Sequence, residues 1–174
     1  MSGDPSRAQG STISAEGEIV MAIYDRICCA VDFSTPSRAT LEEAAMLARA
    51  LGAELTLVYV SASEGAPSAA ARMLEAPPEL FEEARAELER KLETWRAEAE
   101  KIVGRRVTAQ LLSGDPASEI VRHAKEEACD LIVVGTHGRS GIAHLVLGSV
   151  AERVVRTAHG PVLVGRRGET VRPD

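Results

Sequence analysis

Short apolar runs alternate with segments of helical periodicity along most of this chain, and this alternation limits the possible folds. We expect strands at five positions: Arg26 to Val31, Leu55 to Val60, Arg106 to Leu112, Leu131 to Val134 and Pro161 to Val164. Most of these runs are continuously apolar, as parallel strands are when helices cover both faces of a sheet. Residues 106–112 alternate instead, which is typical of a half-exposed edge strand. Strands and helices joined by right-handed crossovers predict an α/β fold, a doubly wound five-stranded parallel sheet with helices on both faces.

Capping residues mark where the intervening helices begin. Thr35 followed by Pro36 predicts one helix start, with Thr35 as the N-cap and Pro36 at the first helical position. Asp115 followed by Pro116 predicts a second start in the same way. A long helix is expected from Glu79 onward. Its apolar residues recur every three or four positions and are expected to face the core: Leu80, Ala84, Leu88, Leu92, Trp95, Ala99 and Ile102.

The 174 residues are enough for one domain with a substantial core. Residues 1–22 are mostly small and polar, and we expect them to form a disordered N-terminal extension. Residues 23–167 should form the folded domain, and residues 168–174 a flexible tail. The segment from Ser61 to Pro78 is rich in Ala, Ser, Gly and Pro and is expected to be a surface loop or a lid.

Charge and cysteine content exclude several classes of protein. The net charge of −6 argues against non-specific nucleic-acid binding, which needs a basic face. An anionic ligand would therefore be held by local dipoles and a few cations. Cys28, Cys29 and Cys129 lie in apolar sequence without metal-ligand spacing, so we expect free thiols in a reducing cytoplasm. The apolar runs are far shorter than the ~20 residues that span a bilayer, and no signal peptide is expected.

A glycine-rich stretch that follows the fourth apolar run has the layout of an anion site. Gly135, Gly138 and Gly148 occur before Ser149, where a helical pattern begins. Glycines let the backbone approach a ligand closely, and a helix N-terminus directs unpaired N–H groups at it. The pattern therefore predicts a phosphate site.

Part of this stretch also has a purely structural explanation. Ser149 and Glu152 form the S-x-x-E pattern of a capping box, which would explain the serine without any ligand. His137 and Arg139 lie within the stretch, and either could contact phosphates or be an exposed loop side chain.

Asp32 directly follows the first predicted strand of the domain. Ligands of doubly wound sheets bind beyond the carboxyl ends of the strands, where the strand order reverses. If the first strand is central, its neighbour across the reversal is the strand that ends at Gly135, and Asp32 would share one site with the glycine-rich stretch. A carboxylate there suits ribose hydroxyls or an adenine amino group. Asp32 could instead cap the turn at Ser34 or Thr35.

Several segments together resemble a known family. The spacing G-x2-G-x9-G-S/T is met in full by the three glycines and the serine described above. The segments AVDFS (30–34), GDPASEI (114–120) and PVLV (161–164) match as well. On these residues the chain resembles universal stress proteins of the ATP-binding type, and the resemblance extends from about Tyr24 to Arg166.

The resemblance implies strand order 3-2-1-4-5, a fold like that of the adenine-nucleotide α-hydrolases, and a bound ATP. The residues implied around the adenosine are Ala30, Asp32, Val60 and Val134, with Gly135 near the ribose and the phosphates. The residues implied at the phosphates are Gly138, Gly148, Ser149 and Val150, and Arg139 is added to them from its place within the stretch. Mg²⁺ or Mn²⁺ would bind through the phosphate oxygens. Family members often carry Pro at position 30 and Met at position 134. Both differences are apolar, so they bear on packing of the base and not on the phosphate site.

These observations predict an ATP-binding universal stress protein that acts as a nucleotide-dependent stress-response switch, whose surface a protein partner reads. The sequence has no GxxxxGK P-loop, no nucleophile with a paired His, and no carboxylate cluster for two metals, so at most slow hydrolysis is expected. An adenine-nucleotide α-hydrolase enzyme would need glycines after the first strand, which residues 32–36 lack. The alternative is an interaction scaffold of the same fold that uses no nucleotide.

The last apolar run suggests how two copies could associate. Val162 to Val164 is apolar on both faces and comes last in the chain, where it is expected at a sheet edge. Exposed apolar edges favour pairing with another strand. We therefore expect a homodimer in which these strands meet, as the resemblance also implies.

Overall fold

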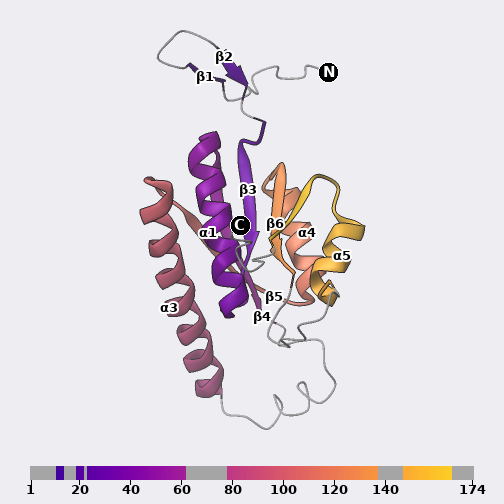
Figure 1. Cartoon of the computed structure of the whole chain (residues 1–174). Coiled ribbons are helices and arrows are strands. Elements are labelled where there is room, and N and C mark those ends of the chain that lie inside the picture. The colour runs from indigo at the N-terminus through magenta and orange to yellow at the C-terminus, as the bar shows by residue number, and fades with distance from the viewer. Residues whose placement is uncertain (1–10, 14–18, 22, 62–77, 137–146, 166–174) are drawn as a thin grey trace, which may run out of the picture.

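The structure is a computed structural model that describes residues 11–13, 19–21, 23–61, 78–136 and 147–165 (Figure 1). One sheet contains five strands: β3 (Arg26–Ala30), β4 (Glu54–Ser61), β5 (Thr108–Ser113), β6 (Leu131–Gly135) and β7 (Val162–Gly165). Four helices accompany it in the described residues: α1 (Thr35–Leu51), α3 (Pro78–Val103), α4 (Pro116–Glu126) and α5 (Ser149–Thr157).

All neighbouring strands of this sheet are parallel, in the order β5-β4-β3-β6-β7. Counted along the domain, this is the predicted order 3-2-1-4-5, so the doubly wound α/β fold is confirmed. Strand β3 is central, with Ile27 opposite Leu55 of β4 on one side and opposite Leu131 of β6 on the other. The half-exposed run that was predicted to be an edge strand is β5, at one edge, and β7 is at the other.

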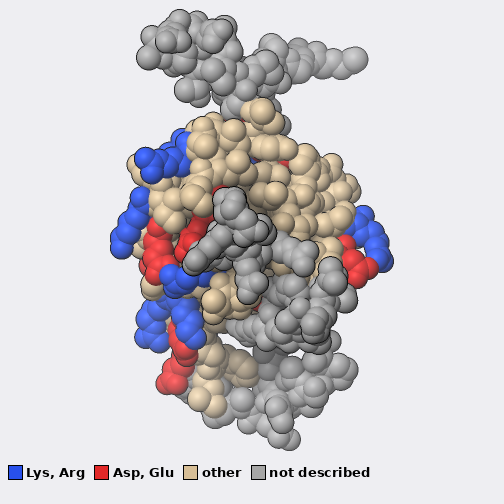
Figure 2. All heavy atoms as spheres, in the orientation of Figure 1, with Lys and Arg blue, Asp and Glu red and all other residues tan. Residues whose placement is uncertain are grey.

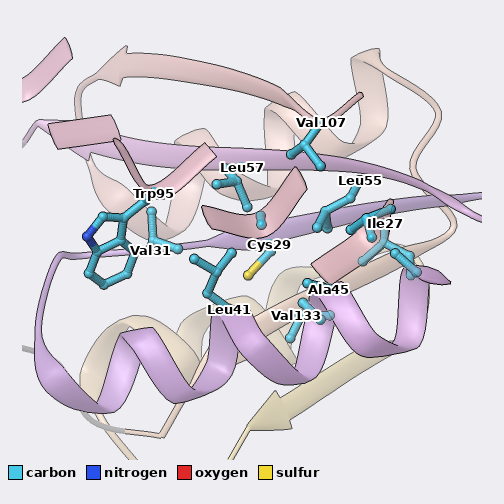
Figure 3. Close-up of a cluster of buried hydrophobic side chains, with 14 of the residues drawn as sticks. Ile27, Cys29, Val31, Leu41, Ala45, Leu55, Leu57, Trp95, Val107 and Val133 are labelled. Carbon is cyan, nitrogen blue, oxygen red and sulfur yellow. The ribbon is translucent and has the colours of Figure 1, made fainter. Parts of the chain in front are cut away.

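The helices cover the two faces of the sheet, with α1 and α3 on one side and α4 and α5 on the other (Figure 1). Alternate residues of β3 serve the two faces, because side chains of a strand alternate. The buried side chains form two hydrophobic core clusters, one on each face of the sheet. Cys29 packs in the larger cluster with Leu41 of α1 and Trp95 of α3 (Figure 3). Cys28 packs in the second cluster with Ile120 of α4. One continuously apolar run therefore supplies both cores.

Helix α3 departs from its predicted role in its first turns. Leu92, Trp95 and Ala99 are buried as expected, but Leu80 is 55% exposed and Ala84 is exposed as well. The prediction that the whole stripe is core is therefore wrong at this end. At about 1.5 Å per residue the 26-residue helix is roughly 39 Å long. The longest strand, with 8 residues, spans about 26 Å. The first turns of α3 extend beyond the sheet (Figure 1).

The outer side of α3 carries closely paired charges. Arg85 with Glu89, and Lys91 with Glu87, form ion pairs one helical turn apart at 2.9 and 2.6 Å. Figure 2 shows basic and acidic side chains gathered together on the side of the molecule where α1 and α3 lie. Exposed pairs of this kind stabilise a helix by only about 0.3–0.5 kcal/mol each, so α3 depends mainly on its buried residues.

Strands β1 (Ser11–Ile13) and β2 (Ile19–Met21) form a separate antiparallel pair. They lie in the segment for which the sequence analysis expects a disordered extension. Thr, Ile and Val are β-branched residues that favour strands, and these two short segments are rich in them. The rest of residues 1–22 lies outside the described residues.

The cysteines are free thiols, as expected. Cys28 and Cys29 are fully buried, and burial raises the pKa of Cys29 to about 12. A thiol with so high a pKa is unreactive at neutral pH, because the thiolate is the nucleophile. As for membrane association, none of the described helices combines the length and the apolar character that a bilayer crossing requires.

His123 of α4 makes stability depend on pH in a predictable direction. Its side chain is buried, and no hydrogen-bond partner of Nε2 is found among the described residues. Burial lowers the pKa of His123 below its ordinary 6.5. Glu127 and Glu126 raise this pKa and Arg122 lowers it, all by smaller amounts. As the pH falls through about 6.5, the unfolded state therefore binds more protons than the folded state, and the free energy of unfolding falls.

We expect the melting temperature to fall between pH 7 and pH 5.5 by less in His123→Leu than in the unmodified chain. Thermal unfolding followed by circular dichroism at both pH values measures this. His159 is exposed, so His159→Leu serves as the control and should keep the full pH dependence. Equal slopes for His123→Leu and the unmodified chain would refute the prediction.

Candidate functional site

The carboxyl ends of β3 and β6 lie side by side at the centre of the sheet. These strands are parallel neighbours, yet the chain leaves them in opposite directions, toward β4 from β3 and toward β7 from β6. This is the topological switch point at which doubly wound sheets bind ligands. Asp32 lies two residues after the end of β3 at Ala30, and Gly135 ends β6, so both predicted residues are at the carboxyl end of the sheet, as expected.

Three of the predicted apolar residues gather on one face of the sheet at this edge. Val134 is buried in the second cluster, and Ala30 and Val60 are half-buried against the same cluster. Ala151 from the first turn of α5 is buried there too. The face covered by α4 and α5 therefore presents an apolar surface next to the switch point.

Asp32 is held in a tight turn. Its Oδ1 accepts hydrogen bonds from the backbone N–H of Ser34 at 3.0 Å and from the Ser34 hydroxyl at 2.5 Å. Its own N–H donates to Oγ of Ser37 at 3.0 Å. The alternative in which Asp32 caps the turn at Ser34 is thus realised. It holds Oδ1 against Ser34 and so sets the direction of the side chain.

The same turn corrects the predicted start of α1. The N-cap is Ser34 and not Thr35, since Ser34 Oγ accepts from the N–H of Ser37 at 3.3 Å. Pro36 consequently occupies the second helical position. Both residues before Pro36 are good caps, and the hydrogen bond from Ser34 to Asp32 favours Ser34.

The glycine-rich stretch is closed at its base. Residues 137–146, with the predicted Gly138, Arg139 and His137, lie outside the described residues. On either side of them, the N–H of Gly148 donates to the carbonyl of Thr136 at 2.7 Å. Thr136 in turn donates its N–H to the carbonyl of Gly165 in β7 at 3.1 Å. The first and last parts of the stretch are therefore tied to each other and to the edge strand.

Helix α5 begins beside this closure without a side-chain cap. Its N-cap is Gly148, which makes no side-chain hydrogen bond, and Ser149 is the first helical residue. The capping-box alternative for Ser149 and Glu152 is therefore wrong. Ser149 and Val150 are exposed. With no capping side chain found among the described residues, the first-turn N–H groups suit an anion as acceptor.

An ion pair that the sequence analysis missed joins α5 to α4. Arg153 donates from Nη1 to Asp115 Oδ1 at 2.7 Å and from Nη2 to Oδ2 at 2.9 Å. Asp115 is also the N-cap of α4, as predicted, and accepts from Ser118 N–H at 3.0 Å. Arg153 and then Ser118 lower the pKa of Asp115 to about 2. The two residues are 38 positions apart, so no local pattern pairs them.

The described residues contain no group of three or more His, Cys, Asp or Glu side chains that could hold a metal ion. A divalent cation can also take oxygen ligands from a bound molecule. Phosphate oxygens are such ligands, and Mg²⁺ commonly binds proteins in this way, with few protein groups in its shell.

Comparisons with known proteins agree with this geometry. The model of the universal stress protein family matches residues 23–166. The universal stress protein MJ0531 of Methanocaldococcus jannaschii is 35% identical over 150 residues, which cover 83% of this chain and 84% of the relative. The solved structure of MJ0577, from the same organism, matches with a TM-score of 0.72 and 28% identity, over 85% of this chain and 99% of that one. A universal stress protein from Archaeoglobus fulgidus, solved in complex with dAMP, matches with a TM-score of 0.58 and 28% identity, over 82% of this chain and 98% of that one.

Proposed function

Because the chain belongs to the universal stress protein family, we propose that it binds ATP and acts as a nucleotide-dependent stress-response switch. One observation carries the proposal: the N-terminus of α5, which has Gly148 as its N-cap, lies at the same carboxyl end of the sheet as the Asp32 turn. The first feature suits phosphates and the second suits a nucleoside. The Archaeoglobus fulgidus relative was solved with dAMP, which supports an adenine nucleotide as the ligand class.

Each half of the proposed site has its own chemistry. Ala30, Val60 and Val134 would pack against the base, and Asp32 would face the nucleoside. The phosphates would lie at the N–H groups that follow Gly148. The residues assigned to that end are Gly135, Gly138, Arg139, Gly148, Ser149 and Val150, of which Gly138 and Arg139 lie outside the described residues.

The role of these residues would be to bind and orient the nucleotide. Mg²⁺ or Mn²⁺ would be held through the phosphate oxygens and would offset their charge. The two arginines of α5 are already paired, Arg153 with Asp115 and Arg156 with Glu152. This arrangement favours a switch over an ATPase. We propose the cytoplasm as the compartment, which the three free thiols support.

The test is direct. Small molecules released from the purified chain are identified by mass spectrometry, and binding of Mg-ATP is measured by isothermal titration calorimetry. An adenine nucleotide in the first measurement, or saturable binding in the second, supports the proposal. If the protein carries no nucleotide and binds none at millimolar ATP, the scaffold alternative replaces it.

A homodimer through β7 is the second part of the proposal. Leu163 of β7 is 39% exposed, and Val155 on neighbouring α5 is 48% exposed. The opposite edge strand, β5, instead exposes polar side chains such as Thr108 and Gln110. An apolar edge is the one that gains most by pairing with a second copy.

We expect Leu163→Asp to convert the dimer to a monomer, because it places a charge in the apolar edge. Sedimentation velocity at micromolar protein should then show half the mass of the unmodified chain. Leu80 is also exposed but belongs to α3, on the far side of the sheet, so Leu80→Asp should stay dimeric. A monomeric unmodified chain would contradict the dimer.

A further inference from the structure

Phe33 adopts a backbone conformation that few phenylalanines tolerate. Its φ is +63°, in the left-handed region, where the Cβ of an L-residue is crowded. Ala128 is the other non-glycine residue of the described segments with positive φ, and it lies just after α4, a common place for this geometry. Phe33 instead lies between Asp32 and Ser34 at the switch point. Strained residues of this kind collect at functional sites, where the surroundings hold them.

Aromatic contacts hold Phe33 in place. Its ring stacks on Tyr59 of β4, with centroids 4.5 Å apart and planes at 19°. It also meets Trp95 of α3 edge-on at 5.3 Å and 85°. The chain has only two Phe, two Tyr and one Trp, so this cluster uses most of its aromatic side chains. Arg38 lies 5.2 Å from the centroid of the Trp95 ring and pairs with Glu98 at 2.6 Å.

The turn at Phe33 determines where Asp32 points. A residue in the left-handed conformation reverses the local direction of the chain. This reversal brings both the N–H and the hydroxyl of Ser34 onto Oδ1 of Asp32. Phe33 itself faces the larger core cluster on the α1 and α3 side. Ring packing on that side therefore fixes a carboxylate at the sheet edge.

We propose that Phe33, clamped by Tyr59 and Trp95, is the positioning residue for the nucleoside half of the ligand site. The proposal rests on the proposed function, since it assumes that Asp32 contacts the nucleoside. The phosphate half is held by other bonds, from Gly148 to Thr136 and from Arg153 to Asp115. Phe33 takes part in none of them. Loss of the ring should therefore weaken binding of the nucleoside and leave binding of the phosphates unchanged.

The experiment compares two ligands by calorimetry, Mg-ATP and magnesium tripolyphosphate, which has the phosphates without the nucleoside. Phe33→Ala should bind ATP about tenfold more weakly, a change of about 1.4 kcal/mol, with an unchanged dissociation constant for tripolyphosphate. Phe33→Tyr keeps a stacking ring and should restore ATP affinity. Phe81→Ala removes the other phenylalanine, which is partly exposed on α3, and should alter neither affinity.

The outcomes separate the two claims. If the unmodified chain binds neither ligand, the proposed function fails and this proposal fails with it. If the unmodified chain binds ATP but Phe33→Ala binds it equally well, or loses both ligands in equal proportion, only the positioning role is overturned. Should Phe33→Ala not fold, Phe33→Leu keeps the apolar volume without a stacking ring. The ratio of its ATP affinity to its tripolyphosphate affinity then tests the positioning role in the same way. Trp95 is the only tryptophan, so its fluorescence reports directly whether each variant keeps the cluster packed.

Discussion

Replacing Gly148 with valine should abolish the thermal stabilisation that Mg-ATP gives to the unmodified chain. Gly148 is the N-cap of α5, and its N–H closes the base of the glycine-rich stretch. Its φ of −58° is open to any residue, so valine should not prevent folding. The added side chain would, however, stand where phosphates need close access to backbone N–H groups. Binding should therefore be lost while the fold is kept.

The expected shift in melting temperature follows from the linkage between ATP binding and folding. At an ATP concentration 100 times the dissociation constant, binding stabilises the folded state by about 2.7 kcal/mol. At about 2–4 °C per kcal/mol for a domain of this size, that is roughly 5–11 °C. Differential scanning fluorimetry with and without Mg-ATP should show this shift for the unmodified chain and none for Gly148→Val.

A second glycine provides the matched control. Gly160 precedes β7, and a Cβ added there would come no closer than 4.0 Å to its nearest neighbour, the carbonyl of Asp130. Gly160→Val should therefore keep the full ATP shift. If Gly148→Val still responds to ATP like the unmodified chain, the phosphates do not bind at the start of α5.

The architecture was predictable because it depends on local patterns. A strand segment buried on both faces must be apolar at every position, as ICCA in β3 and LIVV in β6 are. Strand order followed from the resemblance. The positions of Asp32 and Gly135 near each other then followed from this strand order, because the carboxyl ends of parallel strands lie at the same end of the sheet. Those predictions needed no knowledge of side-chain contacts.

Helix starts were less certain because neighbouring residues compete for one role. Ser34 and Thr35 can both cap a helix before Pro36, and the carboxylate of Asp32 decides for Ser34. Ser149 and Gly148 compete in the same way at α5, and there the glycine is the cap. A pattern such as S-x-x-E identifies a possible cap, whereas the backbone path before the helix selects the residue that is used.

Contacts between distant residues could not be predicted. Arg153 finds Asp115, and Phe33 finds Tyr59 and Trp95, only once the sheet has brought their elements together. The same limit explains the error in α3. Helical periodicity shows which residues share a face, but not how far the opposing sheet extends beneath it.

Truncating Leu92 should cost about 2–5 kcal/mol in the free energy of unfolding, whereas truncating Leu80 should cost less than about 0.5 kcal/mol. Both leucines belong to the same predicted apolar stripe of α3. Leu92 is 4% exposed and packs in the larger core cluster, while Leu80 is 55% exposed. Leu92→Ala leaves a cavity in addition to the lost burial, and Leu80→Ala leaves none.

Urea unfolding at equilibrium, followed by far-ultraviolet circular dichroism, measures both changes on one scale. The two variants make the same chemical change in the same helix, so helix propensity affects them equally. Any difference between them therefore reports the packing of α3 against the sheet. Equal losses would mean that the first turns of α3 are buried in solution, as the periodicity alone predicts. A loss confined to Leu92→Ala would show that the sheet supports only the later turns, the part of α3 that carries Trp95 and so holds Phe33 at the edge of the site.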